Sequence, residues 1–304
     1  MSEFDFIEWI RGQNARQTGI PVGIGDDAAI VDISDHGLLA VTSDTIVQDI
    51  DFHVNPGTLF GIGWKALCIS LSDIAAMGLP PLAATCTMSV PPEIDRLGME
   101  EIYRGLKTAA DRFQCPVIGG DLSAAPKGGL SLTSTVFGTG NNPVTRDAAA
   151  AGDVIAVTGQ LGGSLLGKHL NFTPRIAAGL HLNLNYEIHA MIDISDGLSG
   201  DLQHICRASG AGGLLIAEKI PVSQAAKEHA ADTGTSSLEH ALHDGEDFEL
   251  LFTMAKEEWD KLAVDKSLDV MVTEIGEITS SEDLQIIQDG KKRELQPRSF
   301  THKI

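Results

Sequence analysis

Aspartate residues that closely follow apolar segments are the sequence feature that most constrains how this chain can fold. The apolar segments 39–41, 68–71, 116–118 and 190–192 each lead within three residues to an aspartate with glycine, serine or threonine nearby: Asp44, Asp73, Asp121 and Asp193. Because buried strands and helices end at the rim of a core, we expect these aspartates to lie in turns and to converge on one pocket. The fold must therefore bring the ends of several separate segments together.

Composition supports a folded protein with a special use for aspartate. The chain has 304 residues, with 22 Lys and Arg against 42 Asp and Glu, for a formal net charge of −20. At ~150 residues per domain this length predicts two domains, and 43% hydrophobic against 21% charged residues excludes disorder as the main state. The acidic surplus argues against a nucleic-acid partner, which requires Lys and Arg to neutralise phosphates. Aspartate outnumbers glutamate, 25 to 17, so part of the charge is expected to form a metal site.

Cysteine usage and the N-terminal sequence predict a cytoplasmic protein. The four cysteines are far apart and form no CxxC pair, so we expect neither a zinc motif nor a disulfide framework. The first ten residues are acidic where a signal peptide is basic. No run of ~18 apolar residues is found, which predicts no membrane span and no membrane partner.

Glycine and proline separate short apolar segments along the chain. Their spacing predicts helices at 58–77, 98–113 and 198–208, and strands at 38–47, 82–90, 130–138, 153–159, 214–220 and 248–254. Helices and strands alternate without regular βαβ order, which predicts a mixed α/β (α+β) fold in two domains. The turn-rich segment 140–152 predicts a boundary between an N-terminal domain over 1–142 and a C-terminal α/β domain over 143–304.

Two glycine-rich segments match nucleotide-binding motifs only loosely. Residues 23–28 (GIGDDA) fit a dinucleotide fingerprint, but Asp26 and Asp27 would repel a pyrophosphate unless a cation lay between them. Residues 162–169 (GGSLLGKH) fit P-loop spacing, but His169 stands where a P-loop needs Ser or Thr. A glycine-rich turn is the simpler interpretation of the second segment.

The number of aspartate-bearing segments favours a metal site. A single such aspartate is usually a helix cap or an Asx turn. Five sets in one chain suggest otherwise, because carboxylates brought together repel one another unless a cation holds them. Mg²⁺ prefers such oxygens and completes its shell with water and phosphate, and Gly119, Gly120 and the helix start at Gly197 would offer backbone amides to a phosphate. The residues alone therefore predict metal-dependent phosphate chemistry on a nucleotide, without naming the reaction.

Eight segments, in order, resemble the bacterial thiamine-monophosphate kinases of the aminoimidazole-ribonucleotide-synthase-like superfamily. They are GIGDDAAIV (23–31), VTSDTIV (41–47), SLSDIAAMG (70–78), IGGDLS (118–123), PVTRDAAAAGD (143–153), VTGQLGGS (157–164), IDISDGLSGDL (192–202) and GEDFELLFT (245–253). The resemblance runs through nearly the whole chain. It implies ATP-dependent phosphorylation of thiamine monophosphate to thiamine diphosphate with several Mg²⁺ ions. It also implies an N-terminal sheet domain that binds ATP and pairs with its twin in a homodimer.

The matching motifs imply three groups of site residues. The residues that resemble metal ligands are Asp27, Thr42, Ser43, Asp44, Asp73, Asp121, Asp193 and Asp196. Those that resemble ATP contacts are Gly120, Asp121, Arg146 and Ser195, the arginine meeting phosphate. The substrate side would hold Asp51, Glu246 and Phe300.

The implied reaction needs no conventional base. A phosphate monoester already carries about −1.5 to −2 charge at pH 7, so its oxygen needs no deprotonation. Repulsion between two anions opposes reaction, and cations together with in-line positioning remove that obstacle. We therefore predict direct transfer assisted by metal and Arg146, with no catalytic histidine or cysteine.

Three positions depart from the family pattern on the acceptor side. The usual histidine before phenylalanine is replaced by Asp51, with His53 two residues on, so either His53 takes that contact through a local shift or the contact is lost. The family's GGED reads DGED here, with Asp244 in place of the first glycine. The usual basic residue before the proline is missing around Pro174.

Two alternatives stay open. One is another ATP-dependent enzyme of the superfamily, of the aminoimidazole-ribonucleotide-synthase kind. Selenophosphate synthetases need a reactive residue near the N-terminus, yet no cysteine precedes Cys68, and the chain ends in Thr-His-Lys-Ile where hydrogenase-maturation relatives end in cysteine. The other is a non-catalytic ATP- or metal-binding regulator, against which the complete aspartate set argues.

Overall fold

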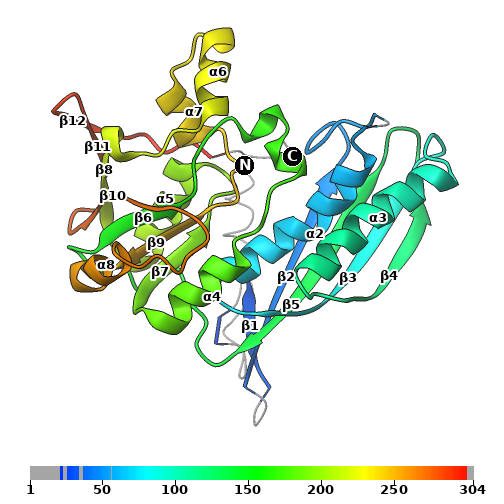
Figure 1. Ribbon diagram of the computed structural model, residues 1–304, viewed down its shortest axis with the longest axis horizontal. Coiled ribbons are helices and arrows are strands. Elements are labelled where there is room, and N and C mark those ends of the chain that lie inside the picture. The colour runs from blue at the N-terminus through cyan, green and yellow to red at the C-terminus, as the bar shows by residue number, and fades with distance from the viewer. Residues whose placement is uncertain (1–20, 23–25, 34–36, 56, 300–304) are drawn as a thin grey trace.

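The computed structural model describes residues 21–22, 26–33, 37–55 and 57–299, and within them it has two β-sheets covered by helices (Figure 1). The first half contains β1 (Ala29–Asp32), β2 (Leu38–Val47), α2 (Leu59–Ala76), β3 (Pro81–Val90), α3 (Arg96–Arg112), β4 (Val117–Ala124) and β5 (Ser131–Gly140). The second half contains β6 (Val154–Thr158), α4 (Ile176–Asn185), β7 (Ile188–Asp193), α5 (Leu198–Ser209), β8 (Gly212–Ile216), α6 (Gln224–Thr233), α7 (Ser237–His243), β9 (Leu250–Met254), α8 (Lys256–Leu262), β10 (Val272–Thr279), β11 (Leu284–Gln288) and β12 (Lys291–Glu294). The mixed α/β fold is thus confirmed.

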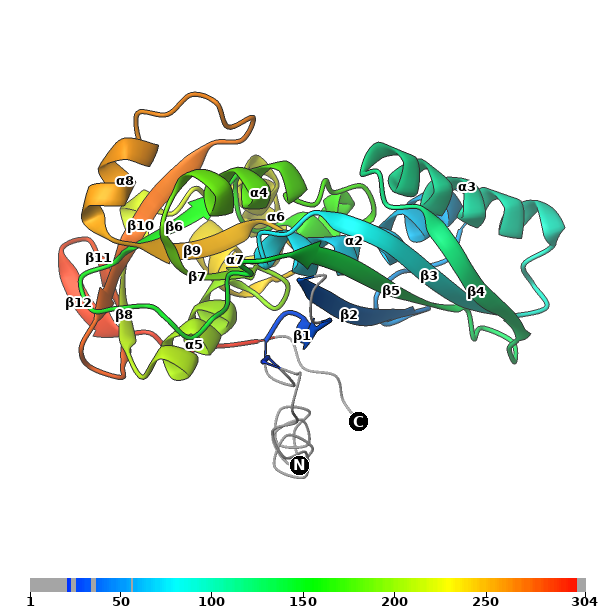
Figure 2. The same ribbon diagram turned by 90° about the horizontal axis from the view of Figure 1, so that it is seen from below.

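The first sheet has the strand order β1-β2-β5-β3-β4 and is helix-covered on one side only. Neighbouring strands are antiparallel except β3 and β4, which run parallel. In β5, Leu132, Ser134 and Val136 are buried, while the residues between them are half-exposed. Figure 2 shows why: α2 and α3 lie on one side of this sheet, and the described chain leaves the other side open.

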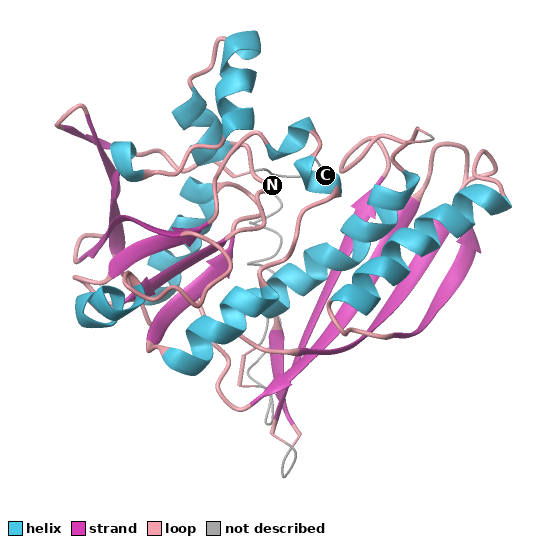
Figure 3. Ribbon diagram, in the orientation of Figure 1, coloured by secondary structure: helices cyan, strands magenta, loops and turns pink. Residues whose placement is uncertain are grey.

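The second sheet has the order β12-β11-β8-β10-β6-β9-β7. Only the pair β8 and β11 is parallel. Its central strands β6 and β9 are buried along their whole length, as expected for strands packed on both faces. Figure 3 shows the helices that surround them, including α5 and α8.

Helix α2 joins the two halves of the molecule. It packs on β2 and β5, on α3, and on α4 and β7 of the second half. Its mean hydropathy of 1.4 and its length would suit a membrane span, but 83% of it is buried inside the structure. Burial of this extent is typical of the core helix of a folded domain.

Close contact between α2 and α3 depends on glycine. A Cβ on Gly63 would lie 1.8 Å from the carbonyl oxygen of Ile102, and a Cβ on Gly105 would lie 1.9 Å from that of Phe60. No side chain fits at such distances, so the two glycines bring the helices into backbone contact. This contact fixes how closely the N-terminal half of α2 packs on α3.

Several predicted elements are confirmed and several were missed. The predicted strand 38–47 has the bounds of β2, and the predicted helix 58–77 is α2 to within one residue at each end. The predicted strand 214–220 is wrong after 216, where a 3-10 turn (Ala217–Lys219) follows β8. The sequence did not reveal β1, β4, β7, α4, α6, α7 or the elements after β9. The boundary between 142 and 143 falls between β5 and β6 and stays a prediction.

Most of the aspartates are not in turns, contrary to expectation. Asp44 lies inside β2 opposite Ser134 of β5, Asp73 lies in the last turn of α2, and Asp121 lies inside β4. Asp193 does end its strand, β7. The expectation failed because polar residues at mid-strand or on a helix face are tolerated where hydroxyl groups beside them donate hydrogen bonds.

Candidate active site

Three carboxylates from distant parts of the sequence meet in the interior. Oxygens of Asp27, Asp73 and Asp193 all lie within 4.8 Å of one another. Asp27 precedes β1, Asp73 comes from α2 and Asp193 from the end of β7. Both halves of the molecule therefore build this group, which we call the aspartate triad.

Hydroxyl groups on neighbouring residues hold the triad in place. Thr42 of β2 donates a hydrogen bond to Asp73, and Ser72 Oγ donates to Asp193 Oδ2 at 2.5 Å. Ser70 does the same for Asp44, with 2.8 Å between Ser70 Oγ and Asp44 Oδ2. The last turns of α2 thus supply the Asp73 carboxylate together with hydrogen-bond donors to Asp44 and Asp193.

The electrostatics of the triad call for a cation. Burial, followed by the charges of neighbouring carboxylates, raises the pKa of Asp73 well above its usual range. The pKa of Asp193 is raised by burial and then by Asp27, and burial also raises that of Asp44. Buried carboxylates with raised pKa values are stabilised when a positive charge lies between them.

Arg146 supplies one positive charge to the triad, but one oxygen of Asp27 has no partner. Its Nε donates to Asp27 Oδ2 at 2.7 Å, and its backbone N–H donates to Asp26 Oδ2 at 3.2 Å. Burial, then the charge of Asp27, raises the pKa of Asp26 to about 6. The second oxygen of Asp27, Oδ1, is buried without a hydrogen-bond partner. An orphaned carboxylate oxygen inside a group of acids is what a hard cation would satisfy.

A second acidic group lies at the start of α5. Ligand atoms of Asp196, Asp201 and His204 lie within 4.8 Å of one another. Asp201 accepts the backbone N–H groups of Asp196 and Gly197, at 3.2 and 3.1 Å. Those two amides are therefore already occupied by the Asp201 carboxylate.

Asp201 and His204 were not identified from the sequence. Burial, then the charges of Asp196 and Asp193, raises the pKa of Asp201 well above its usual range, and burial lowers that of His204 to about 4. One signal was available in the sequence. Asp201 and His204 lie four and seven residues after Gly197, which places both side chains on the first turns of the predicted helix, close to the motif that precedes it.

Three predicted site residues lie apart from both acidic groups. Asp121 and Gly120 are exposed on β4, the edge strand of the first sheet. A Cβ on Gly120 would lie 1.8 Å from the carbonyl oxygen of Cys86, so the close pairing of β3 and β4 by itself requires glycine here. Ser43 is exposed in β2, and its Oγ lies 2.9 Å from Thr135 Oγ1. The described structure does not bring these three to the triad.

A third polar group surrounds a buried lysine in the N-terminal half of α2. Lys65 is 1% exposed. Its Nζ donates to Glu246 Oε1 and Oε2, at 2.6 and 2.8 Å, and to the carbonyl oxygen of Asp51, at 2.9 Å. His169 Nδ1 lies 2.9 Å from Glu246 Oε2. Although burial opposes it, the hydrogen bond of His169 and the charge of Lys65 hold the pKa of Glu246 below its usual value.

The loop that carries Glu246 also contacts the segment before α5. The backbone N–H of Glu246 donates to the carbonyl oxygen of Ser195 at 2.6 Å, and that of Phe248 donates to Ile194 at 2.8 Å. Glu246 and Phe248 both have positive φ, 53° and 51°. Such strained backbone in non-glycine residues is often found at functional sites.

Comparison with known proteins now identifies the family. Residues 25–140 match the family model described as AIR synthase related protein, N-terminal domain, and residues 136–289 match its C-terminal domain counterpart. A thiamine-monophosphate kinase of Rhodopirellula baltica is 40% identical over 310 residues, which is 99% of this chain and 97% of the relative. This chain belongs to the thiamine-monophosphate kinase family.

Solved structures agree with this family assignment. The structure described as AaThiL complexed with AMPPCP and TMP has a TM-score of 0.86 at 30% identity, covering 99% of this chain and 97% of that one. The thiamine-monophosphate kinase of Stenotrophomonas maltophilia has a TM-score of 0.75 at 34% identity, covering 96% and 98%. The resemblance stated from the eight motifs is confirmed.

The structure shows which contacts are made at two of the positions that depart from the thiamine-monophosphate kinase pattern. The Asp51 carboxylate accepts the backbone N–H of Val47 at 2.7 Å, and only its carbonyl oxygen meets Lys65. His53 is highly exposed and lies 3.1 Å from Asp49. After the proline, Arg175 donates to both oxygens of Glu249, each at 2.6 Å. Phe300 lies outside the described residues.

The segment 162–169 is not built as a P-loop. The backbone N–H of Gly162 donates to Asp247 Oδ2 at 2.8 Å, so it is not free for a phosphate. Lys168 lies 3.3 Å from Glu249, and His169 belongs to the Lys65–Glu246 group. Neither Lys65 nor His169 was predicted as a site residue. Lys65 is a single lysine within an apolar helix, and His169 belongs to a segment that fits the P-loop motif poorly, so neither pattern indicated a site.

Proposed function

We propose that this chain transfers the terminal phosphoryl group of ATP to thiamine monophosphate, forming ADP and thiamine diphosphate. The observation that carries the proposal is the aspartate triad beside Arg146, in a chain whose full length is similar to thiamine-monophosphate kinases. The structural relative bound to AMPPCP and TMP supports the same pair of substrates.

We propose Mg²⁺ as the metal, with Asp27, Asp73 and Asp193 as its central ligands. The donor set fits, because its oxygens are close, buried and include the orphaned Oδ1 of Asp27. We propose Thr42, Asp44 and Asp196 as further ligands near the triad, whereas Ser43 and Asp121, on the open face of the first sheet, stay predictions from the family motifs. When bound, the metal would neutralise phosphate charge and reduce repulsion between the two reacting anions.

The protein's own groups would position the nucleotide. Arg146 is held by Asp27 at 2.7 Å and lies at the edge of the triad, where a guanidinium can bind phosphate oxygens in pairs. We propose Gly120, Asp121 and Ser195 as further ATP contacts. Ser195 is tied to Glu246 through the 2.6 Å backbone hydrogen bond, which links the nucleotide side to the acceptor side.

We propose that Lys65, Glu246 and His169 lie on the acceptor side, together with Asp51 and Phe300. The lowered pKa of Glu246 keeps its carboxylate ionised at neutral pH, which suits the cationic thiazolium ring of the acceptor. Lys65 acts as a positioning residue, since its ammonium holds both oxygens of Glu246 and the turn at Asp51.

Neither a nucleophile nor a general base is needed. Burial raises the thiol pKa of Cys115 to about 11 and that of Cys206 to about 12, so neither provides a thiolate near pH 7. The acceptor phosphate is already ionised. Transfer would then depend on charge neutralisation and alignment alone.

We propose that the enzyme is a cytoplasmic homodimer that pairs through the open face and edge of the first sheet. Ile118 and Leu122 on edge strand β4 are 67% and 60% exposed, and the sheet face away from α2 has no cover in the described chain. Exposed apolar residues on a sheet edge usually mark a contact surface. The net charge of −20 disfavours nucleic acid as a partner.

A product assay tests the proposed reaction. The full chain with ATP, Mg²⁺ and thiamine monophosphate should form thiamine diphosphate, and Asp44→Asn should lower kcat/KM by about 10- to 100-fold. Asp111→Asn, on the exposed surface of α3, is the matched control and should leave the rate unchanged. Nucleotide binding without any product would instead indicate a non-catalytic regulator. Turnover of a different phosphorylated acceptor would indicate another enzyme of the superfamily.

A further inference from the structure

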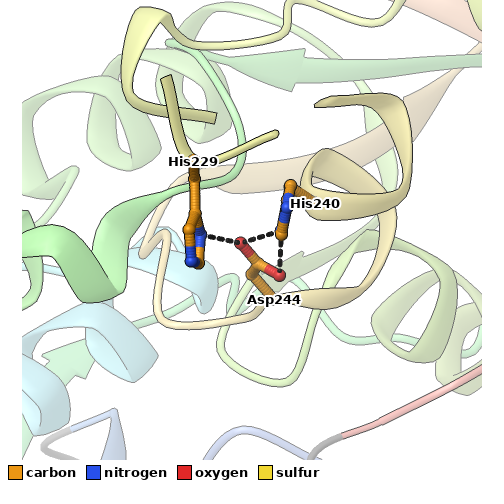
Figure 4. A group of neighbouring side chains, drawn as sticks. All are labelled: His229, His240 and Asp244. Atoms are coloured by element: carbon orange, nitrogen blue, oxygen red, sulfur yellow. Dashed lines mark hydrogen bonds and ion pairs between the residues drawn. The ribbon is translucent and has the colours of Figure 1, made fainter. Parts of the chain in front are cut away.

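A group of two histidines and one aspartate lies on helices that the proposed reaction does not use. His229 is in α6, His240 is in α7, and Asp244 caps the C-terminus of α7. Figure 4 shows the two imidazole rings on either side of the Asp244 carboxylate. One ligand atom from each residue lies within 4.8 Å of the other two. We call these residues the His–His–Asp group.

Both ring nitrogens of His240 have polar partners. Thr233 Oγ1 lies 2.9 Å from the carbonyl oxygen of His229, to which it can donate, and 3.0 Å from His240 Nε2. His240 Nδ1 faces Asp244 Oδ1 and Oδ2 at 2.9 and 3.0 Å. It is therefore the nitrogen that a metal would use, while a proton on Nε2 is donated to Thr233.

His240 Nδ1 and the Asp244 carboxylate can share either a proton or a cation. A proton on His240 Nδ1 would satisfy Asp244 but would leave His229 Nδ1 without a partner. His229 Nδ1 is buried with no hydrogen-bond partner, and it lies 3.9 Å from Asp244 Oδ2. A metal ion accepts both nitrogens and the carboxylate at once, so it accounts for all three atoms.

The geometry points to a transition-metal site, and we propose Zn²⁺ bound by His229, His240 and Asp244. Two imidazole nitrogens and one carboxylate are ligands typical of zinc. The edge of a tetrahedron with ~2.0 Å metal–ligand bonds is about 3.3 Å, and the observed distances of 2.9 to 3.9 Å lie on both sides of it. With zinc on Nδ1, His240 Nε2 would donate to Thr233 Oγ1, the kind of outer contact that orients a metal-binding histidine.

The site would tie α6 to α7 next to the loop that carries Glu246. The imidazole rings stack with centroids 4.4 Å apart and an interplanar angle of 19°, so the two helices already hold the ligands side by side. Asp244 stands where the family pattern has glycine, and its Oδ2 also accepts the backbone N–H of Gly163 at 3.3 Å. The zinc would therefore be a structural feature of this chain, independent of the phosphoryl transfer.

Metal uptake by the full chain tests the site. The chelator-treated protein is dialysed against Zn²⁺ in saturating Mg²⁺, which occupies the triad. We expect one Zn²⁺ per chain, and at least tenfold weaker binding in His229→Ala and in Asp244→Gly. The matched control is His189→Gln, which alters another histidine–aspartate pair, with Asp153 at 2.8 Å. It should bind zinc as the unmodified protein does.

Two further measurements keep the test decisive. Asp244 has helical φ of −67°, and glycine is tolerated there, so Asp244→Gly removes a ligand without preventing folding. Co²⁺ should give the strong visible absorption of a tetrahedral site in the unmodified protein and lose it in both ligand variants. Absence of zinc uptake, or equal uptake in all variants, would overturn the proposal and leave a His240–Asp244 hydrogen bond as the explanation.

Discussion

At the scale of single residues, the triad shows how much the environment changes an aspartate. The same carboxylate that would be fully ionised on the surface has its pKa raised when it is buried beside others, as for Asp73 and Asp193. The hydroxyl groups of Thr42 and Ser72 offset part of that cost by donating to them. The metal-free protein is therefore expected to carry a local electrostatic destabilisation.

Asp73→Asn tests this destabilisation. A raised pKa means that ionisation costs more in the folded than in the unfolded state, so the cost appears as pH rises above about 4 and grows toward neutral pH. We expect the variant to melt about 2–4 °C higher than the parent at pH 7 without metal, a shift of ~1 kcal/mol in a chain of this size. The stabilisation by Mg²⁺ should disappear. Asp111→Asn should change neither quantity, and a lower metal-free melting temperature for Asp73→Asn would count against the argument.

Lys65→Met tests the buried ion pair on the acceptor side. It leaves Glu246 and the carbonyl oxygen of Asp51 without their ammonium donor, and breaking a buried pair typically costs 3–5 kcal/mol. Since Glu246 is 22% exposed and keeps His169, we expect about 3 kcal/mol by urea unfolding. Lys107→Met breaks an exposed pair with Asp111 and should cost under ~1 kcal/mol. Equal losses in the two variants would show that burial of Lys65 is unimportant.

At the scale of elements, α2 decides how the site is assembled. Its contact with α3 through Gly63 and Gly105 and its packing on both sheets place Asp73 where β7 brings Asp193. The helix itself was predictable, because its apolar spacing ends at glycine and proline. By contrast, β4 was missed: seven of its eight residues are exposed, so it shows no alternation of buried and exposed positions.

Gly63→Ala tests the helix contact. The added Cβ would meet the backbone of Ile102, which cannot move aside as a flexible side chain can. We expect a loss of about 2 kcal/mol or more in unfolding free energy, together with weaker Mg²⁺ binding if α2 shifts. In Gly57→Ala the nearest atom is 3.4 Å away, so the change should be within ~0.5 kcal/mol. A neutral result for Gly63→Ala would mean that the helices can separate at no cost.

At the scale of the whole molecule, the net charge of −20 is unevenly distributed. Part of it is concentrated in the triad and in the Asp196–Asp201 group, and much of the rest is on the surface. Bound cations would neutralise the concentrated part, whereas salt screens mainly the exposed charges.

Thermal melting separates these two contributions. We expect Mg²⁺ with a nucleotide to raise the melting temperature well beyond the effect of NaCl at equal ionic strength. The reason is that a ligand at 100 times its Kd stabilises the folded protein by ~2.7 kcal/mol. An equal rise with NaCl would indicate diffuse screening and would contradict a built metal site.

The sequence by itself determined the family, the mixed α/β class, the strongly apolar α2 and the identity of the aspartates, since these depend on local spacing and on motifs. Only the tertiary structure decided which aspartates meet. Asp27, Asp73 and Asp193 are neighbours because α2 crosses from one sheet to the other, while Asp121 and Ser43 stay on an open face. It alone revealed Lys65 against Glu246 and the His–His–Asp group. Contacts between residues far apart in sequence depend on how helices and sheets pack, and local patterns carry little information about that packing.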